Sequence, residues 1–430
     1  MNLLKKMSPG RFIALGFMFV ILTGALLLFL PISHNEGVDV SFIDALFTST
    51  SAVCVTGLNV VDTANTYNVF GRIVVALLIQ TGGLGVTSVG VGFILLARKK
   101  VDFKDRILVK EALNLDSLKG IVKLIKSVLL MTLCFEGVGA ILSFIVFSQD
   151  YPWYKALGIS LFHAISAFNN AGFDILGDFK NLLDYQSNIL LNLTTCGLII
   201  FGGLGFVVIK EIIHKHSFRK FSLHSKVVIS MTVALLTVGT ILLKLTQDIS
   251  WLGAFFFSTS ARTAGFSTYN VGDFTNAGLF VLIILMFIGA SPGSTGGGIK
   301  TTTAFTMIKS AFSVSTNRHC AAFKRQLPTE TISKAFILTF LAMTWVCVCT
   351  FLLSVLEPQY TFIQLLFEEV SGFGTVGLST GITPDLKSPS ELIIIITMYI
   401  GRVGPLTIAS LWSFRPMSNV RYSEESVTIG

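Results

Sequence analysis

The sequence predicts an all-α integral membrane protein in which four repeats of a span, a re-entrant pore helix and a second span surround a pseudo-fourfold pore, giving eight transmembrane helices. Three observations predict this fold: the composition, the lengths of the apolar stretches and a glycine motif that occurs four times. Only 13% of the 430 residues are charged and 52% are hydrophobic, whereas soluble domains contain about 25% charged residues. A soluble protein of this size covers its surface with charge, so the composition excludes a cytosolic enzyme and a nucleic-acid-binding domain.

Eight apolar stretches are close to the length needed to cross about 30 Å of hydrocarbon. The first follows three basic residues, as in a signal peptide, but its apolar run ends at Leu30-Pro31 without a small-residue cleavage site, which predicts a retained span. The sixth is interrupted by glycine and proline. The predicted spans are 11–31, 69–97, 121–147, 187–209, 223–246, 275–316, 331–356 and 389–414.

The distribution of charge predicts the orientation in the membrane. Of the 32 Lys and Arg residues, 24 lie in the N-terminus, in 98–126, 210–226 and 309–334, and after residue 414, whereas 15 of the 24 Asp and Glu residues lie in the alternate connections. Basic connections stay in the cytoplasm, so both termini are expected to be cytoplasmic and the acidic connections to face outwards. The net charge of +8 therefore reflects topology, and no nucleic-acid partner is expected.

Each outer connection contains a further apolar stretch that is too short to span the membrane. These four stretches are 42–53, 153–168, 250–261 and 360–373. Their lengths suggest re-entrant helices, and the alternative is an amphipathic helix that lies on the outer surface. The residues that follow each stretch favour the re-entrant helix.

A matched motif accompanies each short stretch. It begins with Phe, a Ser precedes the motif glycine by five or six residues, and the glycine is followed by Leu or Phe and then by a polar turn. The copies run over 47–58, 162–173, 256–266 and 367–378, and their serines are Ser51, Ser166, Ser260 and Ser371. The motif glycines are 115, 93 and 112 residues apart, which is the signature of an internal repeat. The predicted repeat units are 1–99, 100–216, 217–317 (with the broken second span) and 318–430 (with the C-terminal tail).

The chemistry of this motif points to a cation pore. A helix that stops within the membrane exposes backbone carbonyls, which are tolerated only where they line a water-filled path. Rings of carbonyls replace the hydration shell of a cation, and glycine allows backbone conformations that turn successive carbonyls towards one axis. The alternative is a glycine turn in each of four packed outer hairpins. The candidate filter residues are Val55, Thr56, Gly57, Leu58, Asn170, Ala171, Gly172, Phe173, Thr263, Ala264, Gly265, Phe266, Thr375, Val376, Gly377 and Leu378.

On these motifs the chain resembles the Ktr/Trk/HKT superfamily of potassium transporters, and within it the membrane subunits of bacterial Ktr potassium uptake systems. The likeness covers nearly the whole chain, and the segments that carry it are Phe162–Gly172, Arg262–Phe266, Phe373–Leu378 and the tail from Ser418 to Gly430. Sodium-preferring members often have Ser at the first filter position, where this chain has Gly57. The resemblance therefore implies selectivity for potassium.

The resemblance also implies partners, ions and a location. It implies a homodimer in the bacterial cell membrane, each subunit with its own pore, and a cytoplasmic KtrA-like ring of RCK domains that binds ATP or ADP and controls the gate. Some members are stimulated by sodium, so Na⁺ is expected as an activator or a co-transported ion. Potassium at the filter carbonyls is the only metal expected, with no covalent cofactor and with membrane lipid as the surrounding partner.

The sixth apolar stretch is broken at 289–300, where five glycines and a proline disfavour a regular helix. A phosphate-binding loop is one alternative, but Ile299 separates Gly298 from Lys300 and the stretch does not open a βα unit. A kink that aids packing is the second alternative. The favoured interpretation is a movable loop below the filter, because the superfamily carries an intramembrane gate loop at this position. The candidate gate residues are Gly289, Ser291, Pro292, Gly293, Ser294, Thr295, Gly296, Gly297, Gly298 and Lys300.

Charged side chains are costly inside a membrane, and the sequence places a few there. For Arg402 two interpretations stay open: a structural ion pair with Glu368 or Glu369, and a positive charge beside the pore that limits ion occupancy or couples to the gate. Arg262 precedes the third filter motif and is expected to hold the filter backbone.

Two other functional classes are weaker. A strictly coupled secondary symporter would use the broken helix for alternating access, but inverted repeats are usual in such proteins. An intramembrane enzyme would need a buried nucleophile such as Ser166 with His163, and the sequence has neither a nucleophile elbow nor paired metal ligands. The sequence therefore predicts a transport protein and not an enzyme.

Overall fold

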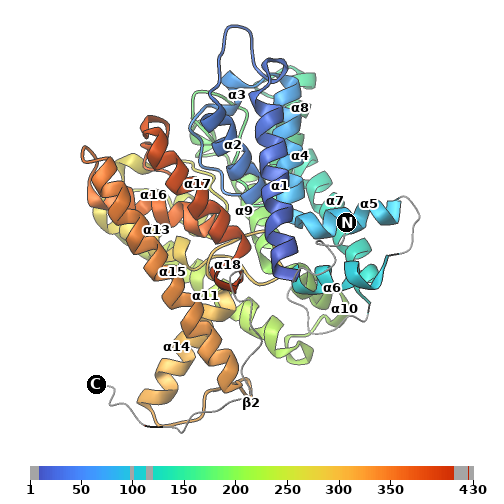
Figure 1. Cartoon of the computed structure of the whole chain (residues 1–430), viewed down its shortest axis with the longest axis vertical. Coiled ribbons are helices and arrows are strands. Elements are labelled where there is room, and N and C mark those ends of the chain that lie inside the picture. The colour runs from blue at the N-terminus through green and yellow to red at the C-terminus, as the bar shows by residue number, and fades with distance from the viewer. Residues whose placement is uncertain (1–8, 97–100, 113–119, 411–424, 426–430) are drawn as a thin grey trace.

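A computed structural model describes residues 9–96, 101–112, 120–410 and 425. The regular secondary structure of the described chain is helical, apart from one two-stranded hairpin (Figure 1). A long helix, a short helix and a following helix occur in this order four times, as the sequence predicts. These triplets are α1 (Pro9–Phe29), α2 (Phe42–Cys54) and α4 (Val69–Leu84); α7 (Ile121–Phe147), α8 (Trp153–Phe168) and α9 (Ile189–Leu204); α11 (Leu223–Thr246), α12 (Trp251–Ser260) and α13 (Asn276–Phe287); and α15 (Thr329–Leu356), α16 (Phe362–Gly374) and α17 (Ser388–Val403).

Shorter elements connect the triplets. In Figure 1 the connections around α2, α3 and α8 gather at one end of the molecule, and α14 and the β-hairpin lie at the opposite end. The connecting helices are α3 (Thr63–Thr66), α5 (Val86–Leu96), α6 (Phe103–Ala112), α10 (Phe206–Lys215), α14 (Thr301–Ser315) and α18 (Pro405–Ser410). The 3-10 turns are η2 (Pro31–Ser33), η3 (Leu183–Tyr185), η4 (Phe218–Lys220), η5 (Val271–Asp273) and η6 (Thr383–Asp385), and the strands are β1 (Ala321–Ala322) and β2 (Arg325–Gln326).

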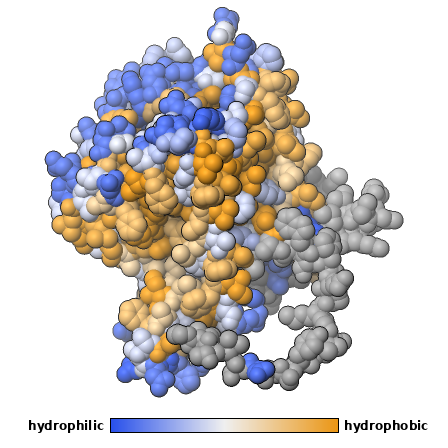
Figure 2. Space-filling view, turned by 60° about the vertical axis from the view of Figure 1, so that its left-hand side comes forward, coloured by the Kyte–Doolittle hydropathy of each residue, from blue (hydrophilic) through white to orange (hydrophobic). Residues whose placement is uncertain are grey.

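The long helices have the length and composition of membrane spans. Four of them, α1, α7, α11 and α15, pass both criteria, and the number rises to six if the bent pairs α4–α5 and α9–α10 each count as one span. The eight-span count predicted from the sequence would add α13 and α17, which are 12 and 16 residues long. Figure 2 shows apolar side chains in a broad band between a hydrophilic upper end and a hydrophilic lower tip, as expected for a surface that meets lipid.

Polar caps mark the start of the short helices α2 and α12, whereas α8 begins after Pro152 without a side-chain cap. Ser41 accepts a hydrogen bond from the Asp44 amide at the start of α2, and the Asp44 carboxylate accepts one from the Ser41 amide. Ser250 caps α12 in a similar way through the Gly253 amide. Such caps satisfy amides that have no partner within the helix. Where a cap fixes the start of a short helix, the length of that helix sets the depth at which the chain leaves it.

Three of the helices that follow the short helices end at a glycine. Each of these glycines lies inside a predicted span. Gly85, Gly205 and Gly404 have φ of 83°, 90° and 98°, a region that favours glycine. The axis bends by 100° between α4 and α5 and by 99° between α9 and α10. The predicted spans over 69–97 and 187–209 are therefore bent, and the predicted span over 389–414 is interrupted at Gly404, because a residue with positive φ cannot continue an α-helix.

The hydrophobic core runs between neighbouring triplets. One cluster joins the first and fourth triplets, a second joins the third and fourth, and a third joins the second and third. Representative members are Phe47, Val75, Leu365 and Met398 of the first cluster, Phe257, Leu282, Val370 and Phe373 of the second, and Phe168, Ile199, Phe256 and Phe266 of the third. Buried apolar side chains therefore bring the ends of the four short helices together.

Candidate functional site

The backbone takes the same unusual course in all four motif loops. In each loop the residue two positions before the motif glycine has a positive φ, and so has the glycine itself. The pairs are Val55 (59°) and Gly57 (94°), Asn170 (61°) and Gly172 (70°), Thr263 (75°) and Gly265 (78°), and Thr375 (49°) and Gly377 (93°). Left-handed conformations are costly for residues with a side chain, so their fourfold recurrence marks a conformation that the surrounding structure imposes.

The four loops form a closed ring. A Cβ atom added to Gly57 would lie well within 3.0 Å of the carbonyl oxygen of Ala171 in the second loop. The same relation leads from Gly172 to the carbonyl of Ala264, from Gly265 to that of Val376, and from Gly377 back to that of Thr56. Each glycine therefore packs against the next loop in sequence order, and the fourth packs against the first. The structure thus brings together the four loops that contain the candidate filter residues, and a side chain at any of the four contact points would collide with the next loop.

The motif serines support three of the loops. Ser51 Oγ accepts a hydrogen bond from the Gly57 amide at 3.0 Å, and Ser371 Oγ accepts one from the Gly377 amide at 3.0 Å. Ser260, which is one residue closer to its glycine, instead donates to the Phe266 carbonyl at 2.5 Å. The Ser166 hydroxyl is buried and has no hydrogen-bond partner within the described chain. The four loops are therefore similar in backbone but not in the contacts that hold them.

Glycines of the following helices pack against the ends of the short helices. Added Cβ atoms at Gly82, Gly202 and Gly401 would meet the carbonyl oxygens of Val53, Phe168 and Phe373. Small residues allow this close approach of backbone to backbone. Because the C-terminal end of a helix carries a partial negative charge, the short helices favour a cation where their ends meet.

A cavity of about 250 Å³ opens at the ring and is lined by Gly57, Gly265 and Gly377. We name it the outer cavity, because the charge pattern predicts that this side faces outwards. Asn181 ties its wall together. Its amide nitrogen donates to the Gly172 carbonyl at 3.2 Å and to Asp174 at 3.2 Å, and its oxygen accepts from the Ser267 amide at 3.2 Å. One side chain therefore links the exits of the second and third loops.

Two acids face this outer cavity, Asp62 and Asp174. Burial, together with the nearby charge of Asp62, raises the pKa of Asp174 to about 6. Asp62 accepts hydrogen bonds from the amides of Asn65 and Phe179 at 2.7 Å each. Acidic groups at a narrow mouth raise the local concentration of cations.

Glu368 holds the exit of the fourth loop. Its carboxylate accepts hydrogen bonds from the Thr380 amide and from the hydroxyls of Ser379, Thr380 and Thr383, all within 3.0 Å. Glu369 accepts from the Thr397 hydroxyl at 2.9 Å. Within the described chain neither carboxylate pairs with an arginine. The expected ion pair between Arg402 and Glu368 or Glu369 is therefore wrong, because Glu368 is already saturated by neutral donors of its own loop.

The broken segment at 289–300 crosses beneath the ring. The Ser291 and Thr295 amides donate to the carbonyls of Gly203 and Gly202 at 3.1 and 3.3 Å. The Gly297 amide donates to the Thr375 hydroxyl at 3.0 Å, directly below the fourth loop. The segment is thus attached to the bend of the second triplet and to the filter itself.

The hydroxyls of the loop form hydrogen bonds within the loop, with the start of α14 and with the end of α8. Ser291 Oγ lies 3.2 Å from Thr301 Oγ1, and Ser294 Oγ donates to the Ser291 carbonyl at 2.6 Å. Thr295 Oγ1 donates to the Phe168 carbonyl at 3.4 Å. These contacts close the loop on itself and on the end of α8.

Two positively charged side chains donate hydrogen bonds to the carbonyls of this loop. Lys300 Nζ donates to the Gly296 carbonyl at 2.6 Å and to the Gly297 carbonyl at 3.3 Å. The Arg402 guanidinium donates to the Thr295 carbonyl and, on its other side, to the carbonyls of Gly82 and Gly83. Arg402 therefore joins the loop to the first and fourth triplets.

A second cavity of about 330 Å³ lies on the far side of the loop. It is lined by Gly83, Gly296, Lys300 and Arg402, and by Glu111 of α6. The outer and inner cavities are thus separated by the ring and the loop. Arg402 borders the inner cavity, as a pore-proximal charge would.

Arg262 has a different position from the one expected. It is 1% exposed and donates through Nη1 to the Thr232 carbonyl of α11 at 3.3 Å. Within the described chain, Arg262 forms no side-chain hydrogen bond with the filter backbone, which it was expected to hold. Its side chain instead connects the end of α12 to the preceding long helix.

Sequence reasoning missed Asn181, the role of Glu368 and the three bends. The bends share one sequence signal, Gly-x-x-Gly, which occurs at 82–85, 202–205 and 401–404. Asn181 and Glu368 carry no local signal, because the loop residues that they link lie seven or more residues away in the sequence. Within the described residues there is no group of three or more His, Cys, Asp or Glu side chains suited to a metal ion.

The chain is similar to known cation transport proteins. The sequence matches the TrkH family, described as cation transport protein, over residues 13–419. It is 40% identical to the potassium/sodium uptake protein NtpJ of Enterococcus hirae over 99% of this chain and 98% of that protein. It is 38% identical to the Ktr system potassium uptake protein B of Bacillus subtilis over 99% and 97%.

A solved structure has the same fold. The crystal structure of the potassium transporter TrkH from Vibrio parahaemolyticus superposes with a TM-score of 0.75 over 95% of this chain and 85% of that chain. The two sequences are 18% identical. At that identity the superposition supports the architecture of the helices and not the details of the site.

Proposed function

This chain belongs to the TrkH family of cation transport proteins, and we propose that it carries potassium ions through a channel-like pore lined by the carbonyls of the four motif loops. The chain is a multi-pass membrane transport protein and not an enzyme. The observation that carries the proposal is the closed ring in which Gly57, Gly172, Gly265 and Gly377 each pack against the next loop. A ring of carbonyls at the ends of four short helices replaces water around a cation.

The direction of transport follows from charge. Ions enter from the outer cavity, which Asp62 and Asp174 face, shed water at the ring, pass the loop and leave through the inner cavity. The membrane potential drives a cation inwards with about 2.3 kcal/mol per charge at 100 mV. We expect this orientation because most basic residues lie in the connections on the opposite side.

The loop at 289–300 is proposed as the gate. It lies between the two cavities and is held by hydrogen bonds from the second and fourth triplets rather than by a helix of its own. Breaking a few of these bonds would free it. A homodimer and a cytoplasmic ring of nucleotide-binding RCK domains remain proposals for what controls it.

Coupled transport with sodium is the second candidate. It is favoured by the printed name of the Enterococcus hirae relative, a potassium/sodium uptake protein. The zero-current voltage of reconstituted protein under opposed potassium and sodium gradients separates the two. A potassium-selective pore follows the potassium gradient alone, and a symporter shifts with both gradients in a fixed ratio.

The filter assignment is tested by flux into vesicles that contain the purified protein. We expect passive, voltage-driven potassium flux that exceeds sodium flux, and we expect Gly57→Ser to admit sodium because its side chain displaces the Ala171 carbonyl. Gly37→Ser is the matched control, since Gly37 also has a positive φ but no atom within 4 Å of an added Cβ. Unchanged selectivity in Gly57→Ser would contradict the proposal.

A further inference from the structure

A patch of basic and aromatic side chains lies at the end of the molecule opposite the outer cavity. It is formed by the turn at 218–220 and by the hairpin at 321–326, which meet through the rings of Phe218 and Phe323 at a centroid separation of 6.0 Å. We name these two segments the basic patch. Its members are Phe218, Arg219, Lys220, Phe323, Lys324 and Arg325.

The cations of the basic patch are unpaired. All four are exposed, and none forms an ion pair within the described chain. The two rings are also exposed, at 42% for Phe218 and 43% for Phe323. Exposed aromatic rings among unpaired basic groups are the composition of a surface that meets the interface of a membrane.

The hairpin displays its side chains in a strained turn. Phe323 and Lys324 form the two-residue connection between β1 and β2 and have φ of 50° and 63°. Such turns favour Asn and Gly, because both central residues have positive φ. A bulky ring and a long cation in this turn cost stability, which leads to a functional hypothesis for them.

The basic patch lies where lipid headgroups are expected. α11 begins at Leu223, directly after Phe221 and Ser222, and α15 begins at Thr329, three residues after Gln326. Both helices are candidate spans. In Figure 2 the lower tip of the molecule is hydrophilic beneath a band of apolar side chains. The patch is thus at the edge of the hydrocarbon, on the side that the basic connections assign to the cytoplasm.

We propose that the basic patch binds the headgroups of anionic phospholipids in the cytoplasmic leaflet. Each basic side chain near an anionic surface contributes attraction that falls off within a Debye length. An acidic protein is the other possible occupant by charge alone. The membrane is favoured because both rings are exposed and both segments adjoin spans.

The two segments of the patch both lead back to the gate loop. α10 ends next to the patch, and at its start the Phe206 amide donates to the Gly293 carbonyl at 3.1 Å. α14 begins at Thr301, directly after Lys300, and ends before the hairpin. If the gate assignment holds, a lipid that draws the turn and the hairpin together therefore restrains both segments that touch the loop.

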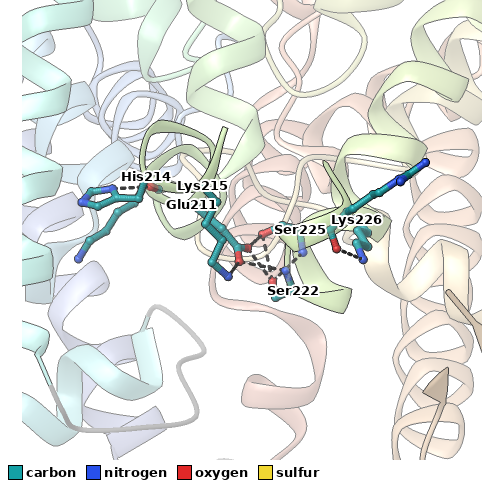
Figure 3. A network of polar contacts seen from close by, with 8 residues as sticks. Glu211, His214, Lys215, Ser222, Ser225 and Lys226 are labelled. Atoms are coloured by element: carbon teal, nitrogen blue, oxygen red, sulfur yellow. Dashed lines mark hydrogen bonds and ion pairs between the residues drawn. The ribbon is translucent and has the colours of Figure 1, made fainter. Parts of the chain in front are cut away.

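A network of polar contacts makes the first of these connections stiff. Glu211 of α10 accepts hydrogen bonds from the Ser222 amide at 2.9 Å and the Ser222 hydroxyl at 2.8 Å, and it also bonds Ser225 and Lys215 (Figure 3). Lys226 Nζ donates to the Arg219 carbonyl at 3.0 Å. The turn is therefore fixed to α10 and α11, so a displacement of the turn would also displace these helices.

The binding test does not depend on transport. Phe218→Trp places a fluorophore in the patch, and the signal of the unmodified chain is subtracted because four Trp residues are present. Vesicles contain phosphatidylglycerol and phosphatidylcholine in equal amounts, with bromine on the acyl chains of one lipid at a time. We expect brominated phosphatidylglycerol to quench the introduced indole several-fold more than brominated phosphatidylcholine, since one basic residue near the surface changes local binding roughly fivefold.

Matched variants decide the outcome. In the Phe218→Trp background, Lys324→Gln with Arg325→Gln is expected to abolish the preference for brominated phosphatidylglycerol. Lys123→Gln with Lys126→Gln, which removes two exposed cations at the start of α7, is expected to leave it unchanged. Equal quenching by the two lipids, or equal loss in both double variants, overturns the site.

The coupling to the gate is tested by flux in the same vesicles and rests on the proposed function. Potassium flux should differ between vesicles with and without phosphatidylglycerol in the parent chain and not in Lys324→Gln with Arg325→Gln. Lipid-independent flux with preferential quenching overturns the coupling and leaves the binding site. Absence of potassium flux under every condition contradicts the proposed function and leaves the quenching result intact.

Discussion

The ring of motif loops and the layer beneath it differ in symmetry. In the ring, four segments share the same pair of positive φ angles and each contacts the next. In the layer below, the helices of three triplets end at a single glycine, at 85, 205 and 404, whereas the third triplet inserts the segment 289–300. Only one of four repeats therefore occupies the space below the ring.

This difference separates two physical requirements. Replacing the hydration shell of a cation needs oxygens on all sides, which four equivalent loops supply. Closing a path needs one obstacle, and four copies of a loop would collide on the axis. A single inserted segment can change its position without disturbing the ring, because its bonds to the rest of the protein are a small number of hydrogen bonds.

The largest effect is expected from breaking the ring. Gly377→Ala would place a Cβ against the Thr56 carbonyl at a φ of 93°. If strain of about 3 kcal/mol falls on the conducting geometry, potassium flux decreases about a hundredfold. The measurement is the initial rate of potassium uptake into vesicles at equal protein content.

A nearby glycine controls for backbone strain. Gly381 also has a φ of 93°, but an added Cβ finds no atom within 4 Å. Gly381→Ala therefore carries the strain without the collision and should reduce flux far less. Similar losses in both variants would show that the ring contact is not what matters.

Releasing the single loop should have the opposite sign. Arg402→Gln removes a guanidinium that bonds carbonyls of the loop and of the first triplet. Hydrogen bonds to charged groups contribute about 1.5–3 kcal/mol each, so we expect basal flux to rise about tenfold. Stopped-flow potassium flux without any partner protein measures this rise.

Arg72 offers a matched control for the loss of an arginine. Its guanidinium also binds backbone carbonyls, those of Tyr67 at 2.8 Å and Ala64 at 2.5 Å, but in an outer connection. Arg72→Gln should leave basal flux unchanged. If Arg402→Gln is folded by size-exclusion chromatography and its flux matches that of the parent chain, the loop is not held by Arg402.

A smaller effect tests how equal the four loops are. Ser51→Ala removes the acceptor of the Gly57 amide, whereas Ser166 has no partner within the described chain. A buried amide left unpaired costs about 1–3 kcal/mol, so Ser51→Ala should lower the ratio of potassium to sodium flux several-fold. Ser166→Ala is the paired variant and should change this ratio little; the reverse order would contradict the assigned supports.

Much of the architecture could be predicted from the sequence. The lengths of the apolar stretches predicted both ends of α7, α8 and α11 correctly, and the repeated motif predicted the positions of the four loops. These features depend on local sequence, because a span needs its own apolar residues and a left-handed turn needs its own glycine. The bends at Gly85 and Gly205 were missed because a Gly-x-x-Gly pattern also occurs in straight packed helices.

The partners of charged groups could not be predicted. Arg402 and Glu368 are close enough in the sequence to suggest a pair, yet Glu368 is saturated by three hydroxyls and an amide of its own loop. Arg402 meets carbonyls that helix ends and a broken segment leave unpaired. Unpaired backbone groups are properties of the fold, so no composition or spacing reveals them in advance.

The smallest expected effect concerns the approach to the ring and not the ring itself. Burial raises the pKa of Asp174 from 3.8 to about 6. The carboxylate is therefore charged at pH 7.5, attracts cations to the outer cavity, and loses this charge as the external pH falls through about 6. At low potassium and low ionic strength we expect flux to fall about twofold between external pH 7.5 and 5, because one charge at the mouth changes only the local ion concentration.

Asp174→Asn separates this effect from acid effects on the ring. Its flux should equal that of the acidified parent chain at both pH values, and its selectivity for potassium should be unchanged because Asp174 lies outside the four loops. Raising the ionic strength to about 0.5 M should reduce the difference between parent and variant, since salt screens the attraction of Asp174 for cations that are more than a few ångströms away in solution. A variant that keeps the full pH dependence would show that another group titrates. In that case the outer mouth, like the gate, would depend on a residue that the fourfold pattern does not mark.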